Sequence, residues 1–337
     1  TPTFFSSEHL KLLINGILES ADLHSNYSFS FEGHPNNTTI HHLKELFNLG
    51  FRRVSYGVQD LDYKVQKTIN RIQPFENVKE ATYSARSIGY NSVNFDLVYG
   101  LPFQRVDSVE NTIDKVIDLK PERIAFYSYA HVPWKHPSQR AYTDTDLPSS
   151  NVKRRLYEVG KEILLAAGYT DVGMDHFALQ EDGLYKAYQN KTMHRNFMGY
   201  TEAKTELLIG LGASAISDAK YGYAQNIKRI EDYNSTVSLD STPVFKGHEL
   251  TKNELEVRDK ILSITCKGEL KWKAGQLNLP QLIQLNQMSD EGLIDLYDDG
   301  LHIKKLGMAF LRNICAVFDP KLNQEQTSQQ PVFSKAI

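Results

Sequence analysis

The clearest strand in this 337-residue chain reads SVNFDLVYGLP over residues 92–102. Apolar side chains alternate in it with Ser, Asn and Asp, which is the two-residue period of a half-buried strand. Gly100 and Pro102 end the strand, so Asp96 lies near its carboxyl end. Ligands of parallel α/β proteins bind at that end of the strands, which makes Asp96 a candidate binding residue.

Predicted strands and helices alternate at least five times along the chain. Besides 92–98, we predict strands at 27–32, 51–59, 123–130 and 170–175, and helices at 6–20, 38–49, 62–70, 76–88, 109–119 and 151–167. Residues 178–200 are polar and predicted to be irregular, and a helix over 201–210 and an extended segment over 213–217 follow. Such alternation predicts an α/β fold with a parallel sheet or barrel.

The character of the chain changes after about residue 240. A capping signal at 250–254 opens a helix through 264, and further helices are predicted at 282–292 and 306–317, with a hairpin at 293–303 between them. We therefore predict a main domain over 1–240 and a smaller, mainly helical, winged-helix-like domain over 241–337. Because the chain is acidic, we expect the smaller domain to cover the active site rather than to bind DNA.

Composition narrows the possible partners. The net charge of −3 disfavours nucleic acid as a partner, and no apolar run approaches the roughly 18 residues of a membrane span, so no membrane partner is expected. Only two cysteines are present, Cys266 and Cys315, which excludes a disulfide framework and favours a cytoplasmic location. Two cysteines alone also cannot form a four-ligand zinc or iron–sulfur site.

Three polar residues, Glu32, Gln59 and Asp96, stand at the carboxyl ends of the first three predicted strands. Ser, Asn and Gly share their face, whereas a filled barrel interior needs branched apolar side chains, so this face predicts an open, ligand-holding lumen. Carboxylates and amides there can grip ribose hydroxyls or an amino group, although capping of neighbouring helices is the alternative role. Arg71 could pair with a ligand carboxylate or with one of these acids, or could be an ordinary surface arginine.

Several longer motifs resemble those of a known enzyme family. SYGVQD at 55–60, NR at 70–71 and DLVYGLP at 96–102 resemble the radical S-adenosylmethionine (SAM) enzymes of porphyrin metabolism. Four more motifs are similar to the oxygen-independent coproporphyrinogen III oxidases in particular: GMDHFA at 173–178, HRNF at 194–197, YAQN at 223–226 and RNIC with FD at 312–319. The resemblance covers essentially the whole chain and implies a partial (β/α) TIM-like barrel of the radical SAM type.

By this resemblance the enzyme converts two propionate side chains of coproporphyrinogen III to vinyl groups and so forms protoporphyrinogen IX in haem synthesis. A [4Fe-4S] cluster reduces SAM, and the resulting 5′-deoxyadenosyl radical removes a hydrogen from the propionate before CO2 and one electron are lost. An electron donor such as flavodoxin or ferredoxin is implied as a partner. The cofactors perform the chemistry, and the protein supplies position and exclusion of water.

The resemblance also implies roles for individual residues. The residues that match SAM contacts of the family are Thr1, Glu32, Gln59, Arg71, Asp96, Ala130 and Ile216. The candidates for binding the porphyrinogen are Asp175, His176, His194, Arg195, Tyr223, Gln225, Asn226 and Arg312. No catalytic residue is assigned.

The chain departs from the family at one motif. The family holds its cluster with a Cys-x3-Cys-x2-Cys motif upstream of a glycine-rich segment, and Thr1-Pro2-Thr3 resembles only the end of that segment. We therefore expect a fragment that lacks the first strand of the barrel, binds no cluster and is inactive by itself, with the cluster cysteines upstream of Thr1. No metal ligand is predicted within the printed chain.

Two other functions remain open at this point. A haem chaperone of the same family would share the barrel and the cluster, but its members lack the HRNF and YAQN patterns. A barrel enzyme without a cluster could instead use Glu32 and Asp96 as acid and base.

Overall fold

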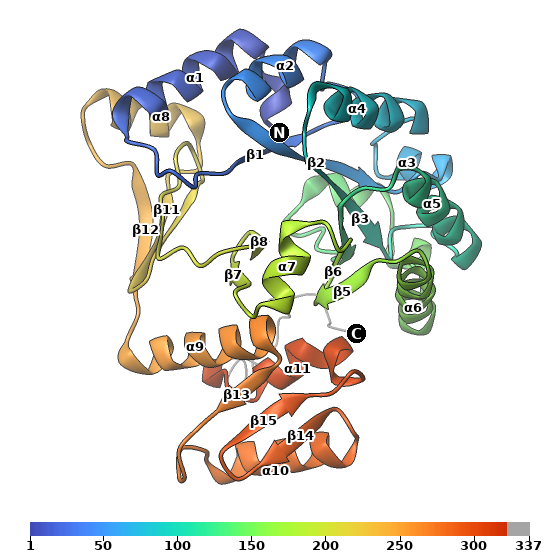
Figure 1. Cartoon of the computed structure of the whole chain (residues 1–337), viewed down its shortest axis with the longest axis vertical. Coiled ribbons are helices and arrows are strands. Elements are labelled where there is room, and N and C mark those ends of the chain that lie inside the picture. The colour runs from blue at the N-terminus through green and yellow to red at the C-terminus, as the bar shows by residue number, and fades with distance from the viewer. Residues whose placement is uncertain (322–337) are drawn as a thin grey trace. The chain divides into compact units, whose positions relative to one another are not determined.

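The computed structural model describes residues 1–321, which form two compact units. The first unit spans Thr1–Tyr185, and the second begins at Lys186 (Figure 1). The predicted boundary near residue 240 therefore falls inside the second unit. The division into a main domain over 1–240 and a smaller domain over 241–337 stays a prediction. Part of the predicted smaller domain, residues 322–337, lies outside the described residues.

The first unit is built on a six-stranded sheet in the order β1-β2-β3-β4-β6-β5. The strands are β1 (Phe29–Gly33), β2 (Phe51–Gln59), β3 (Ser92–Tyr99), β4 (Arg123–Ser128), β5 (Thr170–Gly173) and β6 (His176–Ala178). The first four strands run parallel, so their carboxyl ends meet at one edge. The predicted α/β class with a parallel sheet is confirmed.

The prediction of a single strand over 170–175 is wrong, because the chain turns back within it. Gly173 and Met174 have φ angles of 137° and 46°, and β6 pairs antiparallel with both β5 and β4. Positive φ at consecutive residues is typical of tight hairpin turns. Asp175 and His176 are consequently placed toward the carboxyl end of β4, since Phe126 N donates a hydrogen bond to Asp175 O and His176 pairs with Ala125.

Helices cover one face of this sheet (Figure 1). They are α1 (Ser7–Ser20), α2 (Ile40–Asn48), α3 (Tyr63–Thr68), α4 (Phe75–Ile88), α5 (Val106–Leu119) and α6 (Ser150–Ala166). The short 3₁₀ helices η1 (Pro2–Phe4), η2 (Pro137–Ala141) and η3 (Asp144–Asp146) also occur in this unit, and α7 (Gly183–Gln189), in the segment predicted to be irregular, crosses its end. Side chains of Ser6, Thr39, Asp62 and Ser149 accept backbone N–H groups at helix starts, as N-caps do. The predicted helices of this unit are confirmed to within a few residues.

The core lies between the helices and the apolar face of the sheet. Tyr56 and Phe95 on neighbouring strands are fully buried, as are Leu43, Ile113 and Leu156 on the covering helices. The opposite face carries the small polar side chains that the alternation predicted. Burial of the bulky face therefore determines which way Glu32, Gln59 and Asp96 project.

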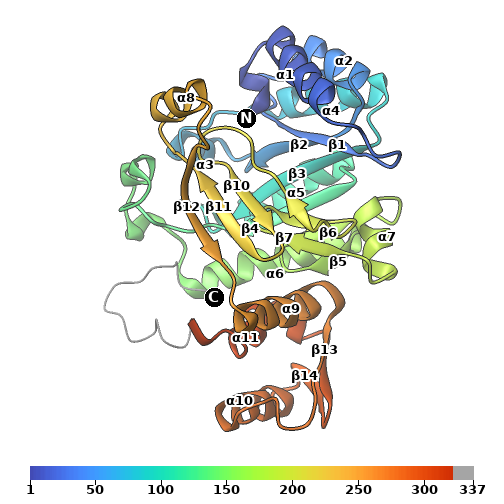
Figure 2. The same ribbon diagram turned by 90° about the vertical axis from the view of Figure 1, so that its left-hand side faces the viewer.

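The second unit begins with the hairpin β7 (His194–Asn196) and β8 (Gly199–Thr201), followed by a four-stranded antiparallel sheet in the order β12-β11-β10-β9 (Figure 2). Its strands are β9 (Leu207–Leu208), β10 (Ile216–Ala219), β11 (Gly222–Asn226) and β12 (Val244–Glu249), with α8 (Ile230–Ser238) between the last two. The helix predicted over 201–210 is wrong. Leu207 and Leu208 pair with β10 instead, and Gly210 packs so closely on Ile216 that a Cβ would meet its carbonyl oxygen at 2.6 Å.

The end of the second unit has the predicted winged-helix-like pattern. It contains α9 (Lys252–Lys267), β13 (Glu269–Lys271), α10 (Leu279–Asp290), β14 (Ile294–Tyr297), β15 (Gly300–Ile303), η4 (Gly307–Phe310) and α11 (Leu311–Ala316), with a sheet in the order β13-β15-β14. Thr251 and Glu254 form the capping box that starts α9. Within residues 1–321, no helix combines the length and the apolar character needed to cross a membrane.

Candidate functional site

The candidate site lies at the carboxyl edge of β1, β2 and β3. Glu32 pairs in register with Ser55, Ser55 with Asn94, and Gly57 with Asp96. The three strands thus bring together polar groups that are up to 64 positions apart in the sequence, since Glu32 and Asp96 are the outermost of them. Register between parallel strands, rather than any local feature, places these side chains next to one another.

A hydrogen-bonded cluster occupies the centre of this site. Asn94 Nδ2 donates to Ser55 Oγ at 2.7 Å and to Asp96 Oδ1 at 2.9 Å, and Ser55 Oγ donates to Asp96 Oδ2 at 3.2 Å. Asn94 Oδ1 is buried and has no hydrogen-bond partner within the described part of the chain. Since buried polar atoms are normally paired, this acceptor is a position where a ligand donor fits.

Gly57 allows the side chains of Arg71 and Gln59 to pack closely against the strand. Arg71 Nη2 donates to Gly57 O at 2.8 Å, and a Cβ on Gly57 would lie 2.8 Å from both Arg71 Nη2 and Gln59 Nε2. Arg71 Nε is buried without a partner among residues 1–321. The site therefore offers an unpaired guanidinium N–H and an amide, and both side chains lie where a Cβ at position 57 would displace them.

Burial dominates the electrostatics of the site. The pKa of Asp96 is raised to about 6, chiefly by burial and to a smaller extent by the nearby Glu32, against the lowering effect of hydrogen bonds from Asn94 and Ser55 and of the charge of Arg71. Burial likewise lowers the pKa of Arg71. An incoming cationic or hydroxyl group would relieve the cost of this buried carboxylate, so the site favours a ligand that carries such groups.

Asp96 should therefore reduce stability at neutral pH. Its pKa is above the ordinary value of 3.8, so the native state binds the proton more tightly, and the free energy of unfolding falls as pH rises from about 4 to about 6. We expect Asp96→Asn, which keeps both hydrogen bonds, to raise the free energy of unfolding at pH 7 by about 1–2 kcal/mol, and urea titration checks this.

The higher free energy of unfolding of Asp96→Asn should disappear at pH 3.5, where the carboxyl of Asp96 in the wild-type protein is itself neutral. Asp107 is a control, because it is exposed and its pKa is lowered by a hydrogen bond from Arg105. Asp107→Asn should not stabilise the protein at pH 7. A stability gain from Asp96→Asn that is equal at both pH values would contradict the assigned cause.

The remaining predicted residues of the first unit flank this edge. Thr1 is exposed, and it is Thr3 that is anchored, since its Oγ1 accepts hydrogen bonds from His34 N at 3.1 Å and Thr38 Oγ1 at 3.2 Å. Ala130 follows β4, and its carbonyl accepts a hydrogen bond from Gln139 at 3.2 Å. Asp175 and His176 lie in the β5–β6 hairpin, toward the carboxyl end of β4.

The other candidates belong to the second unit, which is described by itself. Ile216 on β10 pairs with Gln225 on β11. The amide of Asn226 donates to Gly210 O and Gly212 O, which gives this side chain a structural role in the loop before β10. His194 is buried, which lowers its pKa, Tyr223 lies under the guanidinium of Arg258, and Arg312 is on α11.

Arg195 is the candidate of this unit with the clearest unused binding capacity. Its guanidinium lies 5.4 Å from the centre of the Tyr200 ring, within the range of a cation–π contact. Its Nε is buried and has no hydrogen-bond partner in the portion of the chain that is described. The Nε–H of Arg195 can therefore donate a hydrogen bond to an anion, and no existing hydrogen bond of that nitrogen has to break.

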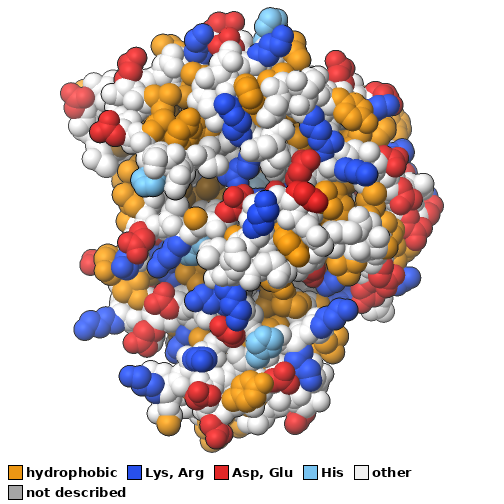
Figure 3. All heavy atoms as spheres, in the orientation of Figure 1, with side chains coloured by type: hydrophobic (Ala, Val, Ile, Leu, Met, Phe, Trp, Pro, Cys, Tyr) orange, Lys and Arg blue, Asp and Glu red, His pale blue; other side chains and the backbone are white. Residues whose placement is uncertain are grey.

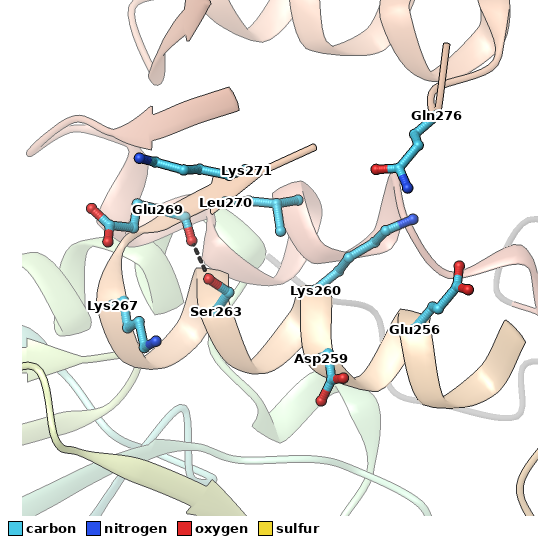
Figure 4. A pocket seen from close by; sticks show the side chains of 9 residues that line it. All are labelled: Glu256, Asp259, Lys260, Ser263, Lys267, Glu269, Leu270, Lys271 and Gln276. Atoms are coloured by element: carbon cyan, nitrogen blue, oxygen red, sulfur yellow. Dashed lines mark hydrogen bonds between the residues drawn. The ribbon is translucent and has the colours of Figure 1, made fainter. Parts of the chain in front are cut away.

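A hollow lies in the winged-helix-like part, with a volume of about 530 Å³ (Figure 4). Its lining contains Glu256, Asp259, Lys260, Ser263, Lys267, Glu269, Leu270, Lys271 and Gln276. Ser263 Oγ donates to Glu269 O at 2.7 Å across one end. Acidic and basic side chains are equally numerous there, and they are also interspersed over the face seen in Figure 3. The hollow therefore selects no charge class.

Residues 1–321 supply no ligand set for an iron–sulfur cluster. No group of three or more His, Cys, Asp or Glu residues that could hold a metal ion occurs among them. Cys266 and Cys315 are buried, and burial raises the pKa of both thiols, that of Cys315 to about 12. Since thiolates are the metal ligands, these two cysteines do not fit a cluster site.

Comparison with known proteins gives consistent results. The sequence model of the Radical SAM superfamily matches residues 5–116. The oxygen-independent coproporphyrinogen III oxidase of Helicobacter pylori strain 26695 is 35% identical over 332 residues, which cover 96% of this chain and 73% of the relative. The protein of the same name from Escherichia coli K12 is 34% identical over 346 residues, which cover 100% of this chain and 75% of the relative.

A solved structure agrees with these sequence matches. Coproporphyrinogen III oxidase from Escherichia coli, described as a radical SAM enzyme, superimposes with a TM-score of 0.91 at 33% sequence identity. The match covers 95% of this chain and 76% of the solved chain. The similarity thus extends over both units rather than over the segment 5–116 alone.

Proposed function

This chain belongs to the oxygen-independent coproporphyrinogen III oxidase family of radical SAM proteins, and we propose that it performs that reaction. The reaction is the oxidative decarboxylation of two propionate side chains of coproporphyrinogen III to vinyl groups, which gives protoporphyrinogen IX in haem synthesis. The observation that carries the proposal is the extent of the likeness. A shared SAM-binding segment alone would not specify the substrate, but the second unit, with most of the substrate candidates, matches as well.

The edge of β1, β2 and β3 fits SAM chemically. Glu32 and Asp96 offer acceptors for ribose hydroxyls or the amino group, and the Nε of Arg71, which has no partner among residues 1–321, offers a donor for the carboxylate. Gly57 lets Arg71 and Gln59 lie close to the strand. When bound, SAM supplies the radical chemistry that removes a hydrogen atom from a propionate. The family also uses a [4Fe-4S] cluster, and residues 1–321 do not fit it, so we assign no step to it.

For the substrate, we propose that Arg195 binds a propionate carboxylate. Arg195→Ala should weaken porphyrinogen binding about 10–100-fold, because it removes a charge-assisted hydrogen bond, and should leave SAM affinity unchanged. Fluorescence titration with a porphyrin tetracarboxylate under anaerobic conditions measures the first effect, and calorimetry with SAM measures the second.

Arg229→Ala is the matched control, because this arginine is largely exposed and pairs weakly with Glu231 and Asp232. Porphyrin affinity that is the same in Arg195→Ala as in wild type would remove Arg195 from the substrate site. Equal losses of porphyrin and SAM affinity would instead indicate a general structural effect.

The function itself is tested with the full-length gene product after anaerobic reconstitution of its cluster. We expect formation of protoporphyrinogen IX, which is detected after oxidation to the fluorescent porphyrin, with consumption of SAM. Haem binding without turnover would favour a haem chaperone of the same family and would overturn the proposal.

We also propose flavodoxin or ferredoxin as the electron donor and a cytoplasmic location, the latter from cysteine usage.

A further inference from the structure

The chain adopts an unusual backbone conformation at Gln59, the last residue of β2. Gln59 has a φ of 65°, although it is not glycine, and Asp60 N donates a hydrogen bond to Val58 O at 2.9 Å. The two residues on either side of Gln59 are thus joined in a three-residue turn, and the register of β2 against β3 shifts there. Such turns with positive φ at the centre are rare and strained, and they persist only when their surroundings hold them.

The side chain of Asp60 is buried directly beneath this turn, with 1% of its surface exposed. Its Oδ2 accepts a hydrogen bond from Gln104 Nε2 at 2.5 Å, and its Oδ1 accepts from Asp62 N at 2.6 Å and from Thr112 Oγ1 at 3.4 Å. The donors come from the loop after β2, the loop after β3 and helix α5. One carboxylate thereby joins three segments that meet behind the candidate site.

Two glutamines hold the carbonyl groups of Val58 and Asp60, the residues on either side of Gln59. Gln66 Nε2 donates to Asp60 O at 2.9 Å and to Gln73 O at 2.7 Å, and Gln73 Nε2 donates to Val58 O at 3.3 Å. Gln66 and Gln73 are themselves 4% and 0% exposed. The conformation at Gln59 is therefore determined from both sides by buried hydrogen bonds.

We propose that Asp60 is a positioning residue of the SAM site: its buried carboxylate holds the turn at Gln59, and so keeps the Gln59 amide beside Gly57 and Arg71. The inference rests on the proposed function, because the contact between Gln59 and SAM is part of that proposal. Asp60 itself is buried and its carboxylate is bound by protein groups, so we assign it no contact with SAM and no part in the chemistry.

The hydrogen bonds require a carboxylate at position 60. Asp62 N can only donate, and Gln104 is fixed in its orientation because its Oε1 accepts a hydrogen bond from Leu101 N at 2.9 Å. Asparagine would direct its NH2 group at one of these two donors in either orientation of the amide. Asp60→Asn therefore breaks one buried hydrogen bond and nearly conserves side-chain volume.

The test measures SAM affinity by calorimetry in the reconstituted full-length protein, for Asp60→Asn, Gln59→Gly and the double variant. Each single change should weaken SAM binding about tenfold, the equivalent of one hydrogen bond. The double variant should bind as Gln59→Gly does, because Asp60 acts only through the amide that Gln59→Gly removes. Losses that multiply to about 100-fold would show that Asp60 acts through the fold in general and would overturn the proposal.

Hydrogen exchange provides a readout that does not depend on SAM. The amides of Asp60 and Asp62 should exchange faster in Asp60→Asn, while amides of β1 should not change, and Asp107→Asn should behave as wild type. If Asp60→Asn does not fold, Thr112→Val removes the longest of the three bonds to Asp60 and also the hydrogen bond that Leu61 N donates to Thr112 Oγ1 at 3.2 Å. It should shift the amides of Asp60 and Asp62 by a smaller amount and should also speed the exchange of the Leu61 amide. Unchanged exchange at both amides would overturn the positioning role, whereas a wild-type protein that fails to bind SAM would refute the proposed function alone.

Discussion

Gly57→Val is expected to lower SAM affinity by about 100-fold or more while the protein stays folded. A Cβ at this position would lie 2.8 Å from the ends of two side chains, Arg71 Nη2 and Gln59 Nε2. Those ends are flexible and can move aside, so the cost in stability is small, but both then leave the positions in which they bind the ligand. Loss of the contacts of Arg71 and Gln59 with SAM should cost about 3 kcal/mol of binding free energy. This corresponds to a decrease in affinity of about 100-fold.

Calorimetry with SAM measures this affinity, and urea titration establishes that the variant is folded. Gly57→Ala should give an intermediate loss, because it adds only the first atom. Gly16→Ala is the matched control, since nothing lies within 4 Å of a Cβ at that position on α1, and it should bind SAM as wild type does. Wild-type SAM affinity in Gly57→Val would show that the positions of Arg71 and Gln59 beside Gly57 do not matter for SAM binding.

Phe95→Ala is expected to lower the free energy of unfolding by about 3–5 kcal/mol, the largest effect on stability that we predict. Phe95 is fully buried at the centre of the sheet, and its ring centre lies 6.5 Å from that of Tyr56 on β2. Its truncation leaves a cavity between the sheet and the covering helices, which cannot collapse because the neighbouring strands are hydrogen-bonded on both sides.

Urea unfolding monitored by circular dichroism measures this change at pH 7. Phe4→Ala serves as the control, because Phe4 is 80% exposed and its removal should change the free energy of unfolding by less than about 0.5 kcal/mol. A loss below 1 kcal/mol in Phe95→Ala would contradict the placement of this residue in the core. Phe95 and Asp96 are consecutive on β3 and therefore lie on opposite faces of the strand. Phe95 contributes to the stability of the core, and Asp96 belongs to the candidate binding site.

These two faces illustrate how stability and binding conflict in this protein. The apolar face is buried and stabilises the fold, whereas the polar face holds Asp96 at a raised pKa that costs stability at pH 7. Asp60 is a second buried acid, and burial raises its pKa to about 6 as well. At Asp60 hydrogen bonds from Gln104, Asp62 and Thr112 offset part of the cost of burial. A raised pKa thus marks both a carboxylate of the candidate site and one of the residues behind it.

Local patterns in the sequence were sufficient for much of the fold. Alternation of apolar and polar residues identified β1 to β4, and the capping signal at 250–254 marked the start of α9. The same alternation also placed Glu32, Gln59 and Asp96 on one face, because side-chain direction in a strand has a period of two. The family followed from motifs that are contiguous in the chain, and comparison with known proteins confirmed it.

Patterns failed where the conformation depends on distant partners. Residues 201–206 have helical composition, but the segment they lead into pairs with β10, and the strand predicted over 170–175 turns at Gly173 to pair with β4. The cluster of Ser55, Asn94 and Asp96 was visible only as a shared polar face, and its hydrogen bonds depend on the register of β2 against β3.

The sequence by itself determined the strands, the direction of their polar faces and the family, because each depends on residues close together in the chain. Only the tertiary structure decided how the site is held. The turn at Gln59 depends on Asp60, Gln66, Gln73, Gln104 and Thr112, which are spread over 53 positions from the first to the last. Their hydrogen bonds form only when the loops after β2 and β3 meet α5, and no local period in the sequence records that meeting.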